Sequence, residues 1–600
     1  MRKRTIDYLA LLHNHIDTSQ VPFSDRGSRL LLFRYPDKDA FYIKLAERLT
    51  QLDGNNEAYL NRPPFIQDLC LIDSEGNALE CRVNSSPYCL SVHTPNGDFN
   101  IVFEDGQTIA FGLPPNIVCG LRFQVFPQYW HSSDQGGKFS SIRNLVYNST
   151  GKVLINNITP VEGGYEVNFL IESGQDDAIT IDIYPGDRNI PPNQPFSVMR
   201  SAAEQRWKKW FSKIPPVNRK YARTYAYAWW VMANNLISPQ GKVTFEAMAP
   251  SKVGYVGLWL WDSALHSLAY RYVDPILARN QIQVMLDHQL PTGMLPDAVY
   301  DEGVVYTLDH PIPGIVTKPP ILAWAVLKLH ETDPDDSFLA DVYMPLVRLN
   351  AWWFNMNDDN GDGLAQYNHP YSSGLDNSPL WDEGMPVESP DLNTYLCINM
   401  SSLAGIADIL HLEEEAAMWR RRSKAIVERM VKHFWDPEAG LFWATKDRQP
   451  IKIVTPFNLY PLWTGLLPEK ISKKLLEHLQ NPEMFWGEYP IPTVARNDPK
   501  FEPQNMWRGP VWANINYFFI EALNKIGEKQ LADQLRDRTL EVIMAQTDMY
   551  EYYDAETGSP PSKAVHTFGW TSAIFIDLAI QASRELEKNK EVKNGSRKRN

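Results

Sequence analysis

Apolar and polar residues follow two different periods along this chain, and the first is that of β-strands. Through about the first 190 residues, short apolar or alternating runs such as Phe99–Phe103 and Tyr165–Ile171 are separated by turn signals such as Pro95-Asn-Gly. Alternation of apolar and polar residues is typical of strands that are buried on one face only. Short strands at this spacing predict an N-terminal β-sandwich over residues 1–190.

A change of composition follows the predicted strands. The stretch Tyr184–Pro195 is rich in Pro and Gly, which indicates a linker. The next stretch, Phe196–Ile214, is polar and amphipathic and ends at Pro215-Pro216. We therefore expect residues 191–217 to form a linker and a helix between two domains.

Beyond about Asn218 the apolar residues recur at three- and four-residue spacing, which is the period of an amphipathic helix. Ten segments show it clearly, and 456–467 together with Glu469–Leu479 could raise the number to twelve. Twelve helices joined by alternating short and long connections predict six αα-hairpins closed into a ring over residues 218–586. A superhelical solenoid is the alternative, but no fixed-length self-similarity is present. The ten segments are Tyr221–Ile237, Leu258–Tyr272, Pro275–Leu290, Pro319–His330, Phe338–Met356, Leu392–His411, Glu413–Phe434, Val511–Ile526, Gln530–Ala545 and His566–Leu586.

The end of the chain differs from the rest in its charge. From Lys588 to Asn600 it holds six Lys or Arg residues against one Glu, and we expect residues 587–600 to be a disordered basic tail. The whole chain carries 58 Lys and Arg against 72 Asp and Glu, a net charge of −14. Proteins that bind nucleic acid or coat anionic membranes need the opposite sign, so neither kind of partner is expected.

The sequence shows no evident signal peptide, membrane span, disulfide framework or zinc site. The apolar stretch Tyr8–Leu12 is too short for the core of a signal peptide, and no window approaches eighteen apolar residues. The five cysteines form no CxxC pair, which argues against a disulfide framework or a zinc site. We therefore expect a cytoplasmic protein.

The long connections between the predicted helices concentrate aromatic residues and carboxylates. A carboxylate among Trp side chains loses hydration and seldom occurs there without a role. Nineteen Trp and 27 Tyr also suit a cleft in which sugar rings stack on aromatic faces, although a large aromatic core would account for them equally. The segments are YVGLWLWDSALH (255–266), QLPTGMLPDAVYDEG (289–303), YSSGLDNSPLWDEG (371–384), PQNMWRGPVWANINY (503–517), YEYYDAETG (550–558) and HTFGWTS (566–572).

Five of these segments resemble the signatures of one enzyme clan. WLWDSALH, SGLDNSP, WRGPVWANINY, EYYDAETG and FGWTS are similar, in the same order over residues 255–571, to segments of glycoside hydrolase family 63 and its relatives. Those relatives include trehalases, processing α-glucosidases, and mannosylglycerate and glucosylglycerate hydrolases. The resemblance implies an (α/α)6 barrel, preceded here by the β-sandwich, and hydrolysis of an α-glycosidic bond with inversion.

The resemblance also implies the catalytic pair. Asp376 of SGLDNSP matches the general acid and Glu551 of EYYDAETG matches the general base. An inverting enzyme holds two such carboxyl groups ~6.5–9.5 Å apart to admit the attacking water. An aromatic wall would keep Asp376 protonated, while Glu551 stays ionised. The alternatives are a helix N-cap for Asp376 and a solvated loop acid for Glu551.

The same resemblance implies residues that hold the sugar. Asp262 matches the carboxylate that grips hydroxyls of the cleaved sugar, and Arg508 would bridge carboxylates or anchor a hydroxyl. Helix capping for Asp262, a buried ion pair for Arg508 and core packing for Trp512 and Trp570 are the structural alternatives. Lys318 is a further candidate. The predicted substrate-binding residues are Tyr255, Trp259, Trp261, Asp262, Gln289, Asn377, Trp507, Arg508, Trp512 and Trp570.

No cofactor or metal is predicted. The run Asp358-Asp-Asn-Gly-Asp-Gly looks like the start of a calcium loop, but His369 occupies the position of the bidentate Glu of an EF-hand. We interpret the run as a hydrated turn, and a structural calcium ion there stays open. No phosphate-cradling loop or nucleotide fingerprint is present.

Together these features predict an inverting, exo-acting α-glycoside hydrolase that removes a terminal glucosyl or mannosyl residue from a short oligosaccharide or small glycoside. The alternative is a glucosylglycerate or mannosylglycerate hydrolase. A non-catalytic carbohydrate-binding protein on the same scaffold is the alternative from another class, and an epimerase or lyase on the same ring is also conceivable. The expected partner is a small carbohydrate, and the sequence leaves the oligomeric state open.

Overall fold

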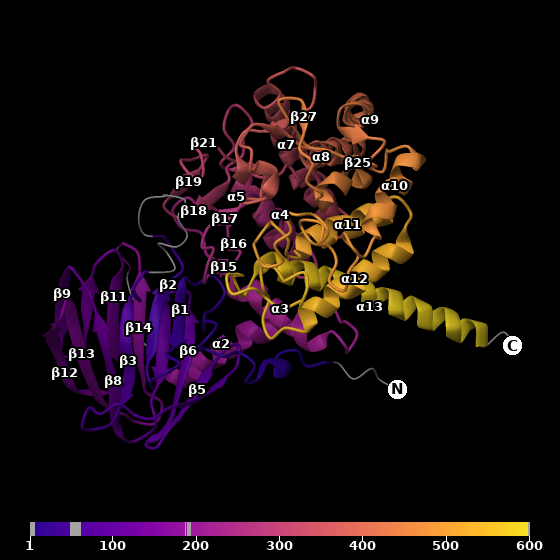
Figure 1. The fold of residues 1–600 in the computed structure, drawn as a ribbon. Helices are drawn as coiled ribbons and strands as arrows, with labels where there is room; N and C mark the ends of the chain where they lie inside the picture. The colour runs from indigo at the N-terminus through magenta and orange to yellow at the C-terminus, as the bar shows by residue number, and fades with distance from the viewer. Residues whose placement is uncertain (1–5, 49–61, 187, 189–193, 598–600) are drawn as a thin grey trace. The chain divides into compact units, whose positions relative to one another are not determined.

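A computed structural model of the chain describes residues 6–48, 62–186, 188 and 194–597 (Figure 1). The described residues divide into two compact units. The first comprises the described residues up to Ser238 together with Lys252–Val256, and the second comprises 239–251 and 257–597. β-Strands dominate the first unit and helices the second, as the change of hydrophobic period predicts.

The first unit contains two antiparallel sheets. Residues from both sheets, among them Leu32, Leu121, Ile101 and Phe111, belong to one hydrophobic core. Two sheets that share a core in this way form the predicted sandwich. Among the described residues, one sheet has the order β1 (Leu30–Arg34), β2 (Phe41–Leu45), β3 (Ile66–Ile72), β8 (Val118–Val125), β13 (Gly164–Glu172), β12 (Lys152–Val161). The other has the order β4 (Arg82–Ser85), β5 (Leu90–Thr94), β6 (Gly97–Asp105), β7 (Thr108–Gly112), β14 (Ala178–Tyr184), β11 (Asn144–Ser149), β10 (Gly136–Ser140), β9 (Tyr129–Ser133).

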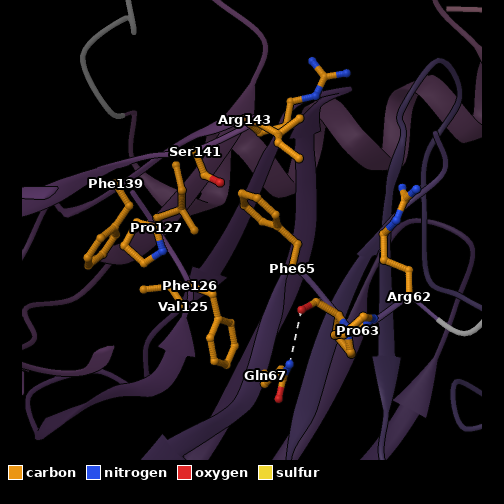
Figure 2. Close-up of a pocket in the computed structure, with 13 residues that line it drawn as sticks. Arg62, Pro63, Phe65, Gln67, Val125, Phe126, Pro127, Phe139, Ser141 and Arg143 are labelled. Carbon is orange, nitrogen blue, oxygen red and sulfur yellow. Dashed lines mark hydrogen bonds between the residues drawn. The ribbon is translucent and has the colours of Figure 1, made fainter. Parts of the chain in front are cut away.

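The sandwich contains an apolar hollow of about 320 Å³ (Figure 2). Phe65, Phe126 and Phe139 line it, with Arg62 and Arg143 also on its wall. Arg143 is buried and paired with Glu47, so its charge is neutralised within the sandwich. The hollow lies entirely in the first unit and contains none of the residues that the sequence predicts to be catalytic.

Two helices complete the first unit. The predicted amphipathic helix is present as α2 (Phe196–Ser212), which packs on β6 and β7. The Pro- and Gly-rich linker before it falls partly on residues 187 and 189–193, which lie outside the described residues. The next helix, α3 (Ala222–Asn234), groups with this unit because it packs on α2, where the Trp210 indole N–H donates to the Trp229 carbonyl at 3.1 Å. The boundary at residue 218 therefore stays a prediction.

The second unit contains a closed circuit of six elements. Each contacts the next and the last contacts the first. Every residue of the first of them, α4, is buried. In order, they are α4 (Leu260–Tyr270), α6 (Leu322–His330), α8 (Pro390–Ile409), the 3-10 helix η4 (Pro456–Thr464), α11 (Ala513–Lys525) and α13 (Gly569–Arg597). Closure of this circuit excludes the open solenoid.

The helices that alternate with the ring along the chain are amphipathic. In α9 the buried residues Trp419, Ile426, Met430 and Phe434 recur at helical spacing, while Glu and Arg fill the other face. Such a helix covers the outside of a core. These helices are α5 (Pro275–Leu286), α7 (Asp336–Met356), α9 (Glu413–Phe434), α10 (Glu469–Leu479) and α12 (Lys529–Met544).

Two segments differ from the simplest expectation. Residues 456–464 of the segment form a 3-10 helix and not an α-helix, and Pro461 inside it lacks the N–H that an α-helical hydrogen bond at that position needs. At the end of the chain, α13 continues to Arg597, so residues 587–597 are helical and not the disordered tail that the charge pattern predicts. Residues 598–600 lie outside the described residues. None of the described helices is both long and apolar enough to cross a membrane.

The remaining elements are short. The 3-10 helices are η1 (Ala10–Leu12), η2 (Pro370–Ser373) and η3 (Pro379–Trp381). The short strands are β15 (Leu236–Ile237), β16 (Ala247–Met248), β17 (Leu258–Trp259), β18 (Ala298–Tyr300), β19 (Gly303–Val305), β20 (Thr307–Leu308), β21 (Gly314–Ile315), β22 (Gln366–Tyr367), β23 (Val387–Glu388), β24 (Trp435–Asp436), β25 (Leu441–Phe442), β26 (Thr445–Lys446) and β27 (Gln449–Pro450).

A buried carboxylate joins the two ends of the ring. Asp577 of α13 is fully buried and accepts hydrogen bonds from Arg271 at 2.7 Å and from Tyr272 at 2.5 Å, just beyond α4. Its other oxygen accepts from the Tyr517 hydroxyl of α11 at 2.7 Å. Burial alone would raise the pKa of Asp577, but Arg271 and the two hydroxyls hold the pKa below its ordinary value.

We expect Asp577→Asn to destabilise the helical unit by about 3–5 kcal/mol, because it leaves the buried Arg271 guanidinium without its counter-charge. Thermal unfolding monitored by Trp fluorescence measures this loss. The control is Lys473→Gln, which breaks the exposed pair with Glu469 on α10 and should change the midpoint little. Equal midpoints for the two variants would contradict a closing role for Asp577.

Candidate active site

The residues that the sequence singles out lie at the starts of the ring elements. Trp261 and Asp262 are in the first turn of α4, and Trp512 is the N-cap of α11. Trp570 is the second residue of α13, and Asp376 lies on the loop before α8. Segments distant in sequence therefore meet at one end of the ring.

Stacked aromatic rings join these segments. Trp507 and Trp512 stack with centroids 3.6 Å apart and planes 9° apart, and Tyr552 stacks on the other side of Trp512 at 4.8 Å. Trp570 meets Trp512 and Trp261 edge-on, at 5.6 and 5.2 Å. All five rings are buried. The cluster thus brings four predicted residues together and acts as the packed support of the site.

The loop that carries Asp376 is fixed against this cluster. Gly374 has a φ of 73°, and a Cβ there would lie 2.4 Å from the Trp261 ring, so a larger residue would push the loop away. The side-chain oxygen of Asn377 accepts a hydrogen bond from the backbone N–H of Trp507 at 2.9 Å, and its amide N–H donates to the side chain of Asn505 at 3.0 Å. Asn377 therefore positions the loop, which is a structural role in addition to the predicted contact with substrate.

One buried lysine lies among the carboxylates. The Lys318 ammonium pairs with Asp297 at 2.6 Å and donates to the Tyr371 carbonyl at 2.6 Å. Lys318, Asp297 and Asp262 are all 5% exposed or less. Burial raises the pKa of Asp262 well above its ordinary value, while Lys318 opposes the rise and the charge of Glu551 adds to it. These effects place Asp262 within electrostatic range of both Lys318 and Glu551.

Asp376 has the environment of a general acid. Burial raises its pKa to about 7, with Lys318 lowering and Asp297 raising it further. Its Oδ1 atom is buried and has no hydrogen-bond partner in the described part of the chain. Asp376 starts no α-helix and its side chain makes no cap, so the N-cap alternative has no support here. A carboxyl group with this pKa holds its proton near neutral pH and can donate it.

Glu551 lies on a well-fixed backbone. Its N–H donates to the Val565 carbonyl at 2.8 Å, and its Oε2 accepts the Val565 N–H at 3.2 Å. The residue is 3% exposed, which is unlike a solvated loop acid. Because Glu551 influences Asp262, and Lys318 influences both Asp262 and Asp376, the two proposed catalytic carboxyl groups belong to one electrostatic cluster. The separation of ~6.5–9.5 Å between them stays a prediction.

Arg508 is bound between two acids. Its guanidinium makes a bidentate pair with Asp382, at 2.8 and 3.0 Å, and Nε donates to Glu502 at 2.8 Å. It also donates to the Asn377 carbonyl at 3.2 Å. Arg508 therefore braces the loop that carries Asp376, which agrees with the predicted bridging of carboxylates.

Two predicted residues are not joined to this cluster. Gln289 donates to the carbonyls of Gly293 and Pro345 and accepts from Arg348, so the hydrogen bonds of its amide hold its loop against helix α7. Tyr255 belongs to the first compact unit. Contact of either residue with a substrate stays a prediction.

Sequence reasoning missed Asp297. It lies beside Trp259, whose side chain hydrogen-bonds to it, and it pairs with Lys318. The carboxylate stands in one of the aromatic loops, in LPDAV, but no motif marks it. Its importance follows from the partner that the fold supplies.

The calcium-like run forms a turn. Asp358 accepts the N–H groups of Asp362 and Gly363 at 3.1 and 3.0 Å, as expected of a turn held by side-chain oxygens. Asp362 lies near Glu388 and His433, and ligand atoms of the three lie within 4.8 Å of one another. His433 and Glu388 already form an ion pair at 2.7 Å, which accounts for both side chains.

Comparison with known proteins supplies the family. A family model described as the mannosylglycerate hydrolase MGH1-like glycoside hydrolase domain matches residues 255–571. A mannosylglycerate hydrolase of Thermus thermophilus is 28% identical over 399 residues, which are 53% of this chain and 93% of the relative. A glucosylglycerate hydrolase of Mycolicibacterium hassiacum is 22% identical, over 54% of this chain and 92% of the relative.

A solved structure shares the fold. A family 63 mannosylglycerate hydrolase from Thermus thermophilus, solved in complex with glucose, has a TM-score of 0.52 and 24% identity. The match covers 59% of this chain and 99% of that one. The matched family region contains the aromatic cluster, Lys318, Asp376 and Glu551. The chain therefore contains an MGH1-like glycoside hydrolase domain, belongs to glycoside hydrolase family 63 and is a glycoside hydrolase.

Proposed function

We propose that this enzyme hydrolyses a small α-glycoside with inversion, and that its substrate is a glycosylglycerate. The observation that carries the catalytic assignment is Asp376: a carboxyl group with a raised pKa and a buried, unpartnered oxygen, in one electrostatic cluster with Glu551. The substrate class rests on the relatives, which are named mannosylglycerate and glucosylglycerate hydrolases. We further propose that the closed circuit of six elements is the inner ring of an (α/α)6 barrel, and that the protein is cytoplasmic.

In the proposed reaction, Asp376 gives its proton to the glycosidic oxygen as the bond to the anomeric carbon breaks. Glu551 takes a proton from a water molecule, whose oxygen attacks the anomeric carbon from the opposite face. The products are the sugar with inverted anomeric configuration and the free alcohol of the leaving group. Asp262 holds hydroxyls of the cleaved sugar. After the products leave, Glu551 releases its proton to solvent and Asp376 takes a proton from solvent, which restores the starting state of both groups.

A second candidate is removal of a terminal sugar from a neutral glycoside or short oligosaccharide. One observation favours it. The two cations of the site are already paired, Lys318 with Asp297 and Arg508 with Asp382 and Glu502. The carboxylate of a glycerate group would have to share one of them or use a group outside this cluster.

The deciding experiment is hydrolysis of a panel of α-mannosyl- and α-glucosylglycerates, the corresponding uncharged glycosylglycerols, and α-linked disaccharides. We expect the glycerates to have the highest kcat/KM. Proton NMR of the first turnovers should show the β-anomer of the released sugar, because water attacks opposite the leaving group. Initial α-anomer would overturn inversion, and higher kcat/KM for the glycerols would favour the second candidate.

We expect Asp376→Asn and Glu551→Gln each to lower kcat by about 10²–10⁴-fold, because each removes one proton transfer without removing bulk. Sugar binding, measured by calorimetry, should persist. The matched controls are Glu383→Gln and Glu556→Gln, which neutralise exposed carboxylates on the same two loops and should leave kcat nearly unchanged. Full activity of Asp376→Asn or Glu551→Gln would mean that the acid or base is another residue, and loss of sugar binding in both would indicate a structural role.

The raised pKa of Asp376 sets a direction for the pH dependence. The general acid must hold its proton, so kcat/KM should fall as pH rises through about 7, the pKa of Asp376 in the free enzyme. Rates measured across that pH with an uncharged α-glycoside test this expectation. A rate that stays level well above this pH would exclude Asp376 as the acid.

A further inference from the structure

Three aspartates, Asp297, Asp376 and Asp262, act on the buried ammonium of Lys318, although within the described part of the chain it forms an ion pair with Asp297 alone. It lies just before α6 and is 5% exposed. An ammonium group has three donor hydrogens. The ammonium donates to the Tyr371 carbonyl at 2.6 Å and forms an ion pair with Asp297 Oδ1 at 2.6 Å. Among the described residues it makes no other hydrogen bond or ion pair.

Asp376, like Asp297, has a buried Oδ1 atom that accepts no hydrogen bond from a described residue. The charge of Lys318 acts on Asp376 and on Asp262 as well as on Asp297. The charged or titratable groups recorded as facing Asp376 are Lys318, Asp297 and Tyr371, which come from the loop before α6, the loop before β18, and η2.

We propose that Lys318 is a positioning residue for the general acid: anchored by Asp297 and the Tyr371 carbonyl, it stabilises the Asp376 carboxylate that remains after the proton has passed to the leaving oxygen. The inference rests on the proposed function. Lys318 stays protonated throughout. The transferred proton comes from the Asp376 carboxyl group alone, and the electron pair of the broken C–O bond goes to the leaving oxygen.

Asp297 provides an internal check on this arrangement. It anchors Lys318, but its own negative charge acts on Asp376 in the opposite direction. Removal of the lysine charge should therefore make Asp376 hold its proton to higher pH. Removal of the Asp297 charge should make Asp376 release its proton at lower pH. A lysine that only neutralises Asp297 would give no such opposed pair of effects.

The test compares Lys318→Met, Lys318→Arg and Asp297→Asn with the wild-type enzyme. The alkaline limb of kcat/KM should move up by about one to three pH units in Lys318→Met, the usual effect of an adjacent charge on a carboxyl group, and should move down in Asp297→Asn. Lys318→Arg keeps the charge, so its limb should stay near the wild-type position even if kcat falls. The control is Lys328→Met, which breaks a similar 2.8 Å pair with Glu521 in a part of the ring away from the aromatic loops and should leave the limb in place.

A direct titration separates this inference from the proposed function. In protein labelled with ¹³C-carboxyl aspartate, the Asp376 signal is identified by its loss in Asp376→Asn, and its midpoint is followed in each variant whether or not substrate is turned over. If Lys318→Met does not fold, the double variant Lys318→Met/Asp297→Asn replaces it, because it removes both charges and leaves neither group unpaired. The titration midpoint of Asp376 in the double variant should lie between the midpoints in Lys318→Met and in the wild type. Equal midpoints in the wild type and the lysine-free variants would overturn the role of Lys318. Shifted midpoints in an enzyme that hydrolyses no glycoside would overturn the proposed function and, with it, the proton transfer that Lys318 is proposed to assist.

Discussion

The helical ring depends on the buried contact between Asp577 and the residues that follow α4. The two helices it joins are about three hundred residues apart in sequence, and no local signal brings them together. Asp577 is reached by Arg271 and Tyr272 from one side and by Tyr517 from another, so it fixes α13 against both of its neighbours in the ring. Gln581 of the same helix is a fourth donor, at 2.6 Å. A buried carboxylate is costly to leave without its donors, which favours this arrangement of the helices.

The helix that carries Asp577 also carries Trp570 of the candidate active site. Trp570 lies seven residues before Asp577, which is two helical turns along the same face of α13. Trp261 stands in the corresponding position at the start of α4, and the two rings meet edge-on at 5.2 Å. The contact between Trp261 and Gly374 then sets the loop of Asp376. Packing between α4 and α13 therefore influences where Asp376, the proposed general acid, lies.

The sequence predicts the helices well because each helix must bury one apolar face, and that face shows as apolar residues spaced three and four apart. Four of the residues that the resemblance implies, Trp261, Trp507, Trp512 and Trp570, pack in one aromatic cluster. The catalytic roles of Asp376 and Glu551 and the sugar-binding role of Asp262 stay predictions. Asp297 could not be found from the resemblance, because its role depends on Lys318, which only the folded chain brings near. Gln289 illustrates the converse: a polar residue in an aromatic loop whose hydrogen bonds satisfy neighbouring carbonyls. The helical end of α13 was missed because a charge pattern gives no measure of how far an established helix continues.

The charges of the site explain why family membership leaves the leaving group undecided. Lys318 acts on Asp262, Asp297 and Asp376, and Arg508 is paired with Asp382 and Glu502. Burial and the charge of Asp297 favour a neutral Asp376, which is the state that the proposed general acid needs before the reaction. Because Lys318 already acts on three carboxyl groups, an additional anion beside it is disfavoured. If the substrate is a glycosylglycerate, as proposed, its carboxylate must lie away from Asp376, where a cation outside this cluster can reach it. The charges around the leaving group, more than the proposed catalytic pair, would then determine which glycoside is cleaved.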